Sequence, residues 1–149
     1  MVIGLVADTD FAGGYQSSPF NFQTFGVNRL VLMRSGTATP RDGYQPNWTS
    51  GEYVDDYWQM QEQLGFHKGD KCVALTHYEW SHGFTLYTFK ITDGPVGSGV
   101  DGPRSKSSIG SARLEIGFSS AQNTNIKVIV MHQMLGVIEF DQFRNIIVS

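Results

Sequence analysis

The sequence has 149 residues, which fits one domain, and it is 40% hydrophobic, 13% aromatic and only 17% charged. The formal net charge of −3 argues against a nucleic-acid surface driven by bulk charge, because phosphate binding needs clustered Lys and Arg. No apolar run is long enough for a transmembrane helix, the N-terminus does not resemble a signal peptide, and the single Cys72 cannot form an internal disulfide.

The first part of the chain predicts two strands separated by loops. Apolar residues alternate in Val2–Ala7 and in Val27–Met33, as expected for strands. Between them, the pair Phe20 and Phe22 is spaced so that it can insert into the core from a loop. Residues 37–49 carry three residues that interrupt regular structure, namely Pro40, Gly43 and Pro46. We therefore expect no long regular element there.

One helix is predicted over residues 50–64. Thr49 and Glu52 have the spacing of a capping box, and Gly65 is a typical stop. The apolar stripe at helical spacing consists of Tyr53, Tyr57, Met60 and Leu64. This helix has two interpretations: it covers one open end of a sandwich, or it presents an aromatic patch to a partner.

The densest aromatic and β-branched run is Gly83–Thr92, which predicts a strand in the middle of a two-layer β structure. Its apolar face switches near Tyr87. A strand packed on one side would keep its phase, so either both faces are covered or a bulge near Tyr87 moves the strand between layers.

Further strands complete the predicted fold. Ala112–Phe118 alternates most cleanly, and other candidates are Cys72–Thr76, Ile126–Met134, Val137–Phe140 and Asn145–Val148. Residues 93–110 are rich in glycine and predict a long loop. About eight strands, one helix and no βαβ alternation favour an all-β antiparallel sandwich of the jelly-roll type.

No set of residues predicts catalysis, a cofactor or a metal. His77 and His82 flank a turn, but their spacing matches no familiar metal pattern. Cys72 lies in an apolar stretch without a base beside it, which is typical of a buried structural cysteine. We therefore expect a protein that is not an enzyme.

Aromatic residues are the remaining candidates for recognition. Rings on the surface of a β-sandwich can stack on sugars, and the same rings can instead fill the ends of the sandwich. The predicted interaction surface consists of Trp48, Tyr57, Trp58, Tyr78 and Trp80, with Tyr44 as a further ring that could stack on a sugar.

An ordered set of short segments resembles capsid-type proteins of Polinton/Maverick elements and their adenovirus-like relatives, in the C-terminal region of those proteins. The matching segments are Val2–Val6, Gly14-Tyr15, Pro19–Gln23, Tyr53–Leu64, Gly83–Phe89, Arg113–Phe118, Val128–Val130 and Val137–Asp141. They span nearly the whole chain. Relatives of this kind are usually longer and carry sequence before this region.

The resemblance implies one jelly-roll domain over residues 1–149, equivalent to the C-terminal domain of a longer capsid protein. It implies a structural role without catalytic residues, association with itself or with other capsid subunits, and a place in a virion assembled in a host cell. The alternative is a β-sandwich head that recognises a glycan or a cell receptor through its surface aromatics. Neither interpretation includes a nucleic acid or a membrane as partner.

Overall fold

The computed structural model describes residues 1–34, 36–66, 73–91, 111–132, 138–140 and 146–148. Within these ranges the chain forms eight strands and three helices. In chain order they are β1 (Val2–Ala7), α1 (Asp8–Phe11), β2 (Val27–Arg34), β3 (Thr37–Tyr44), α2 (Val54–Gln63), α3 (His77–Ser81), β4 (Leu86–Thr88), β5 (Ala112–Phe118), β6 (Ile126–Met131), β7 (Ile138–Phe140) and β8 (Ile146–Val148).

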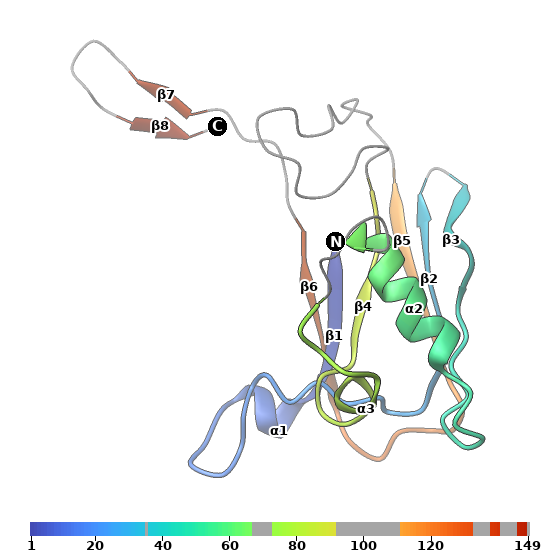
Figure 1. The fold of residues 1–149 in the computed structure, drawn as a ribbon. Coiled ribbons are helices and arrows are strands. Elements are labelled where there is room, and N and C mark those ends of the chain that lie inside the picture. The colour runs from blue at the N-terminus through green and yellow to red at the C-terminus, as the bar shows by residue number, and fades with distance from the viewer. Residues whose placement is uncertain (35, 67–72, 92–110, 133–137, 141–145, 149) are drawn as a thin grey trace.

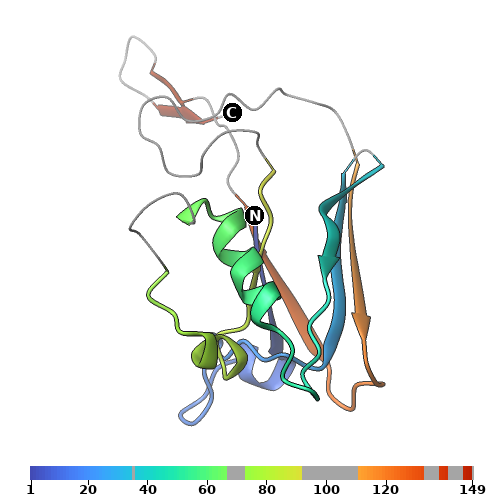
Figure 2. The same cartoon turned by 45° about the vertical axis from the view of Figure 1, so that its right-hand side comes forward.

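Two antiparallel three-stranded sheets form a β-sandwich (Figures 1 and 2). One sheet has the strand order β4-β1-β6, and the other has the order β3-β2-β5. This arrangement confirms the predicted antiparallel sandwich. Within the described residues the sandwich contains six strands instead of about eight, because β7 and β8 pair with each other and with neither sheet.

Strand β1 is central in its sheet. Ile3 lies opposite Tyr87 on one side and Val130 on the other, and Leu5 lies opposite Val128. Directly opposite residues in an antiparallel pair point to the same face. These five side chains therefore share the inner face of the sheet, toward the second sheet.

The core fills the space between the sheets and continues under α2, which lies beside the outermost strands β3 and β4 (Figure 2). Met60 is the buried contribution of α2 to this core. The core consists of Ile3, Leu5, Val27, Leu30, Leu32, Tyr44, Met60, Trp80, Tyr87 and Phe89. Burial of such side chains stabilises each by roughly 1.5–3 kcal/mol.

The expectation that residues 37–49 hold no long regular element is wrong, because Thr37–Tyr44 form β3. β3 pairs with β2, but the register shifts: Leu30 lies opposite Tyr44, whereas Leu32 lies opposite Thr39. The extra residues on β3 include Pro40 and Gly43. A proline is tolerated there because it has no backbone N–H to donate, and an edge strand with a register shift makes fewer hydrogen bonds to its neighbour.

The Gly83–Thr92 segment is not a central strand. Only Leu86–Thr88 forms β4, which is an outermost strand of its sheet. Its register with β1 has no shift, and Tyr87, Thr88 and Phe89 are all buried. Of the two interpretations of the switch near Tyr87, the one with both faces of the strand covered therefore holds, and the one with a bulge does not. Helical and loop segments, instead of another strand, cover the second face.

Helix α2 confirms the predicted helix, although its start differs. It begins at Val54, and its N-cap Tyr53 makes no side-chain capping bond, so Thr49 and Glu52 do not form the predicted capping box. A capping box exists at α3 instead, where Thr76 accepts from the backbone N–H of Glu79 and the Glu79 carboxylate accepts from that of Thr76. This helix occupies a segment that we expected to be a turn.

Some of the other predicted segments agree with the structure, and some do not. Strands β1, β2 and β5 match their predicted ranges closely, and β6 ends at Met131. Residues 73–76 form no strand, whereas Cys72 and the glycine-rich residues 93–110 lie outside the described residues.

Candidate functional site

The five predicted interaction residues occupy different environments. Trp58 and Tyr78 are 58% and 67% exposed, whereas Trp48 and Tyr57 are half-buried. Trp80 is completely buried, so it must be removed from the surface set. The structure therefore leaves two of the five rings well exposed, one on α2 and one on α3.

Trp80 is buried because it sits inside an aromatic cluster between α2, α3 and the sandwich. Its ring lies 5.4 Å from that of Trp48, and its indole N–H donates to the carbonyl of Leu86 at 2.8 Å. Trp48 donates in the same way to the carbonyl of Val27 at 2.7 Å. Both indoles thus bridge loops or helices to the sheets, which is a structural role.

The cluster also contains residues that we did not select from the sequence. The rings of Tyr53 and His77 stack at 4.6 Å, and Tyr57 meets His77 edge-on at 5.5 Å. The Tyr57 hydroxyl donates to the carbonyl of Leu75 at 2.6 Å. Within the described part of the chain, the buried Nε2 of His77 has no hydrogen-bond partner. These contacts fasten α3 to α2.

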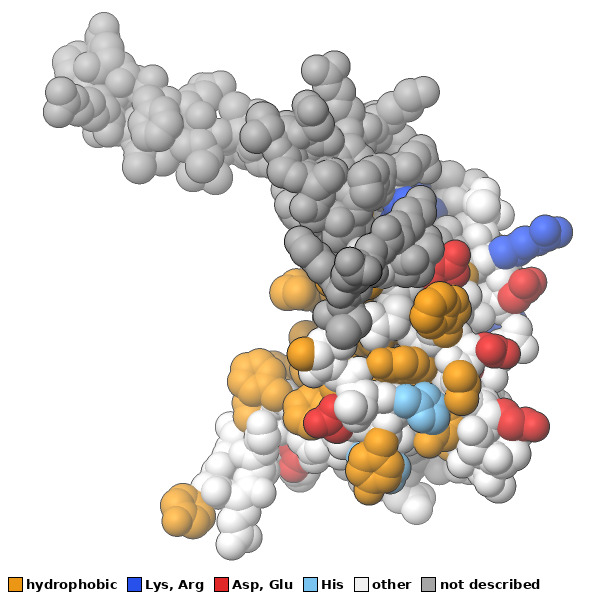
Figure 3. All heavy atoms as spheres, in the orientation of Figure 1, with side chains coloured by type: hydrophobic (Ala, Val, Ile, Leu, Met, Phe, Trp, Pro, Cys, Tyr) orange, Lys and Arg blue, Asp and Glu red, His pale blue; other side chains and the backbone are white. Residues whose placement is uncertain are grey.

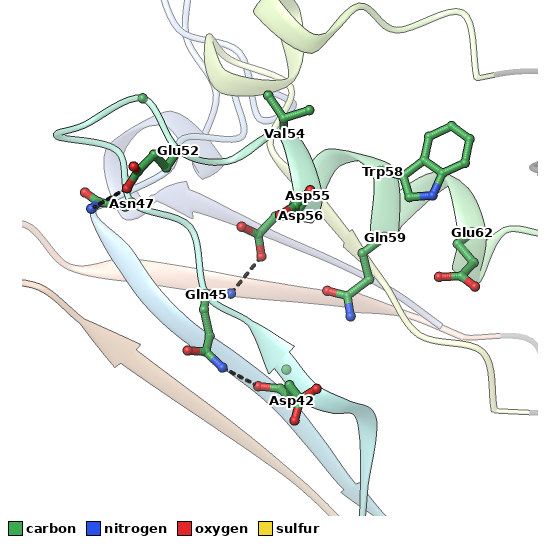
Figure 4. A pocket seen from close by; sticks show the side chains of 12 residues that line it. Asp42, Gln45, Asn47, Glu52, Val54, Asp55, Asp56, Trp58, Gln59 and Glu62 are labelled. Carbon is green, nitrogen blue, oxygen red and sulfur yellow. Dashed lines mark hydrogen bonds between the residues drawn. The ribbon is translucent and has the colours of Figure 1, made fainter.

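A groove lies beside α2 (Figure 4). Its volume is about 1020 Å³. The lining residues come from the end of β3, from the following turn and from α2: Asp42, Gly43, Gln45, Asn47, Gly51, Glu52, Val54, Asp55, Asp56, Trp58, Gln59 and Glu62. We call this the acidic groove, because five of these side chains are carboxylates and none is Lys, Arg or His.

Hydrogen bonds hold the wall of the acidic groove opposite α2. The backbone N–H of Gln45 donates to Oδ1 of Asp56 at 2.7 Å, and the Gln45 amide donates to the carbonyl of Asp42 at 2.7 Å (Figure 4). At the far end, Asn47 and Glu52 exchange backbone hydrogen bonds of 2.9 and 3.0 Å. The β3 end and α2 are therefore joined through Asp56.

The environment of Asp56 in this groove changes the pKa of its carboxyl. Burial raises its pKa above the ordinary 3.8, the Gln45 N–H opposes the shift, and the neighbouring Asp55 carboxylate adds to it. Trp58 and Glu62 lie farther along the helix, away from Gln45 (Figure 4). The groove therefore presents hydrogen-bond acceptors and one exposed indole, a combination suited to hydroxyl-rich or cationic groups.

Figure 3 shows orange spheres over the part of the molecule that holds β1 and β6 and also over α2 and α3, and one group of hydrophobic side chains belongs to the sheet β4-β1-β6. Phe22 covers Gly4 so closely that a Cβ at Gly4 would lie 2.5 Å from the Phe22 ring. Phe22 contacts Phe20, which is exposed, so only one ring of the predicted pair packs on the sheet, and it does so on the outer face.

Strand β6 carries three further exposed apolar side chains, which do not all lie on this outer face. Val128, Val130 and Met131 are 43%, 47% and 67% exposed. Val128 and Val130 point to the inner face, the same face as the buried Ile3 and Leu5. The second sheet therefore leaves the β6 side of the sandwich uncovered. We call this strip, residues 126–131, the β6 edge.

Two features are absent within the described ranges. No three His, Cys, Asp or Glu side chains are placed to hold a metal ion. None of the helices there has the length and apolar character needed to cross a membrane.

Comparison with known proteins gives little further information. No known protein family matches the chain, and no solved structure matches it. A protein of Caenorhabditis elegans, Uncharacterized protein F54H12.2, is 26% identical over 94 residues. The match covers 62% of this chain and 22% of that protein, so the chain corresponds to about a fifth of the relative's length.

Proposed function

We propose that this chain is a structural domain of the capsid type, which acts by associating with copies of itself or with related subunits in a virion and catalyses no reaction. The observation that carries the proposal is the apolar surface of the sheet β4-β1-β6, above all the β6 edge. Exposed apolar patches of this kind on a soluble domain usually mark sites of protein–protein contact.

The strand order supports a jelly roll. A jelly roll has eight strands in two sheets. If the strands of a complete jelly roll are numbered along its chain, the order of neighbours is 1-8-3-6 in one sheet and 2-7-4-5 in the other. Without the first two strands, these orders agree with β6-β1-β4 and β5-β2-β3. The open edges of β6 and β5 are then the positions that a jelly roll gives to its first two strands.

The surface chemistry agrees with a role in assembly. Sheet edges of monomeric proteins usually carry charged residues or prolines that prevent pairing with another chain. The β6 edge has the sequence Ile-Lys-Val-Ile-Val-Met, with one charge, and that Lys127 pairs with Asp8 of the same chain at 3.2 Å. This edge is therefore poorly protected against association.

Measurement of molar mass by light scattering over a range of concentrations tests the proposal. We expect a mass that rises above the monomer value of 16.6 kDa as concentration increases. Because the contact is apolar, the association should persist when the ionic strength is raised. A mass of 16.6 kDa at every accessible concentration would contradict a function based on self-assembly.

A second candidate function is recognition of a glycan or receptor, and the acidic groove is the observation that favours it. Carboxylates and amides such as Asp55 and Gln59 can accept hydrogen bonds from sugar hydroxyls, and the exposed Trp58 can stack on a sugar ring. In a glycan array we expect binding that Trp58→Ala abolishes and Tyr78→Ala preserves, since Tyr78 does not line the groove. Absence of binding by the unmodified chain would exclude this candidate on the glycans tested.

A further inference from the structure

The segment between α1 and β2 contains a loop that projects from the sandwich. It extends away from both sheets beside α1 in both ribbon views (Figures 1 and 2). The side-chain amide of Asn21 donates to Oδ2 of Asp10 at 3.2 Å, which fastens the two ends of the loop together. Compact surface loops whose ends lie close together frequently carry function. We call residues 11–20 the projecting loop.

The projecting loop holds Tyr15 out of contact with the core. Gly14 and Ser17 form an isolated antiparallel bridge, and the backbone N–H of Ser17 donates to the carbonyl of Gly14 at 3.4 Å. Tyr15 and Gln16 therefore form the turn between them. The side chain of Tyr15 is fully exposed. Because this ring buries no surface in its own chain, it contributes nothing to the core and is available to a partner.

Two further aromatic rings of the projecting loop are exposed. Phe11 at its start is 48% exposed, and Phe20 at its end is 70% exposed. Figure 3 shows hydrophobic side chains at the outer end of the segment that projects at the lower left. Single exposed apolar residues are normal, whereas three aromatic rings on one short loop indicate a surface for contact.

Charge is absent from the projecting loop and from the residues that follow it. No Asp, Glu, Lys, Arg or His occurs in residues 11–28. The polar side chains of the loop are the uncharged Gln16, Ser17 and Ser18. Aromatic rings are favoured at the boundary between lipid headgroups and acyl chains, whereas burying a charge in the bilayer is costly. The composition therefore fits the interfacial region of a bilayer.

Shape also favours a bilayer over a protein as the partner. A stable protein interface buries about 800 Å² on each side and requires a matching surface. A short projecting loop offers much less area than this, and residues 11–28 lack the arginines that protein interfaces favour. A bilayer is fluid, so it receives an inserted loop without a matching shape.

We propose that the projecting loop places Phe11, Tyr15 and Phe20 in the interfacial region of a lipid bilayer. The insertion is shallow, because the irregular backbone of the loop needs water or headgroups as hydrogen-bond partners. This inference goes beyond the proposed function and does not depend on self-association, since the β6 edge is a different surface of the chain.

The charge of the chain favours uncharged headgroups. Anionic lipids attract clusters of Lys and Arg, but the loop has neither and the chain has a formal net charge of −3. Binding to pure phosphatidylcholine should therefore be at least as strong as binding to phosphatidylcholine mixed with phosphatidylserine. Raised ionic strength should leave the binding to phosphatidylcholine unchanged.

Flotation of the full chain with phosphatidylcholine vesicles, over a range of lipid concentrations, measures its partition coefficient. The double variant Phe11→Ser, Tyr15→Ser leaves the contact between Phe20 and Phe22 intact. It should lower the partition coefficient by at least about tenfold, because binding scales with the apolar area inserted. Tyr78→Ser is the matched control, since this exposed ring lies on α3, and it should leave partitioning unchanged. Thermal melting followed by circular dichroism establishes that each variant is folded.

A polarity-sensitive dye tests which part of the chain enters the bilayer. In a chain carrying Cys72→Ser, the dye is attached through Tyr15→Cys or, as a control, through Ser50→Cys in an exposed turn. We expect vesicles to shift the emission of the dye at position 15 to shorter wavelength, because it leaves water. The emission of the dye at position 50 should stay the same.

Three outcomes would overturn the lipid proposal. The first is an unmodified chain that does not float with vesicles of either composition. The second is an equal loss of partitioning in the double variant and in Tyr78→Ser. The third is a double variant that lowers the molar mass measured by light scattering while no vesicle binds, which would make the projecting loop a protein contact and leave self-assembly standing.

Discussion

The two sides of the sandwich differ in how completely their core residues are covered. On the side of β3 and β4, α2 and α3 close the core, and several polar groups there are hydrogen-bonded to buried backbone. Thr88, for example, donates its hydroxyl to the carbonyl of Met60 at 2.9 Å. On the side of β5 and β6, inner-face valines remain nearly half exposed. One side is thus a finished core, and the other is a surface that a partner can complete.

The largest expected effect comes from breaking the closed side at Trp80. Trp80→Ala removes a fully buried ring and its hydrogen bond to Leu86, so we expect a loss of about 3–5 kcal/mol in the free energy of unfolding. Trp58→Ala is the matched control, because this tryptophan is largely exposed and should cost less than about 0.5 kcal/mol. Urea denaturation measures both. Equal losses in the two variants would contradict the assigned burial.

A smaller effect distinguishes two buried tyrosines of the same core. The Tyr44 hydroxyl donates to the carbonyl of Thr88 at 2.7 Å and accepts from its backbone N–H at 3.2 Å. The Tyr87 hydroxyl is buried and has no partner among the described residues. Tyr44→Phe should therefore cost about 1–3 kcal/mol, whereas Tyr87→Phe should be neutral or stabilising.

Urea denaturation measures the free energy of unfolding of both variants. The comparison is direct, because the rings of Tyr44 and Tyr87 contact each other edge-on with centroids 5.2 Å apart, and each variant loses only one hydroxyl. A larger loss of stability in Tyr87→Phe than in Tyr44→Phe would contradict this assignment, in which the Tyr44 hydroxyl makes the hydrogen bonds and the Tyr87 hydroxyl makes none.

The smallest expected effect concerns the pH dependence of stability at the acidic groove. Burial raises the pKa of Asp56, so the folded chain holds this proton more tightly than the unfolded chain. Its contribution to stability therefore falls as pH rises from the ordinary pKa of 3.8 through the higher folded value. Asp56→Asn keeps an acceptor for the Gln45 N–H and removes this loss.

Thermal melting from pH 3 to 7 checks this expectation. The melting temperature of Asp56→Asn relative to the unmodified chain should rise with pH through that window. Asp55→Asn removes a charge from the same helical turn at an exposed position and should give only a weaker trend, because burial is the first cause of the raised pKa of Asp56 and Asp55 merely adds to it. A trend of the opposite sign would mean that the ionised Asp56 stabilises the fold.

Prediction from the sequence succeeded where side-chain alternation alone determines structure. Strands β1, β2 and β5 place alternate apolar residues in the core or against it, and this alternation is visible in the sequence. Strand β3 was missed because Pro40 and Gly43 argue against a strand, and only pairing with β2 shows that the register shift accommodates them. Tertiary contacts thus overrode a sound local rule.

The candidate surfaces were harder to predict. Trp80 lies in a five-residue helix whose Thr76–Glu79 capping box is readable in the sequence, but its burial depends on Trp48, far away in the chain. The acidic groove joins the end of β3 to α2 through Asp56 and Gln45, a contact that no local pattern encodes. The β6 edge shows as a run of apolar residues, yet only the sheet order reveals that no strand in the described part of the chain pairs with its other side.

Amide hydrogen exchange as a function of protein concentration measures the open side most directly, because an outward N–H of β6 becomes protected when it pairs with another strand. We expect the outward amides among residues 126–131 to exchange more slowly as concentration increases, while the amides of α2 exchange at the same rate throughout. Exchange of the β6 amides that does not change with concentration would contradict the claim that this edge is where the domain associates.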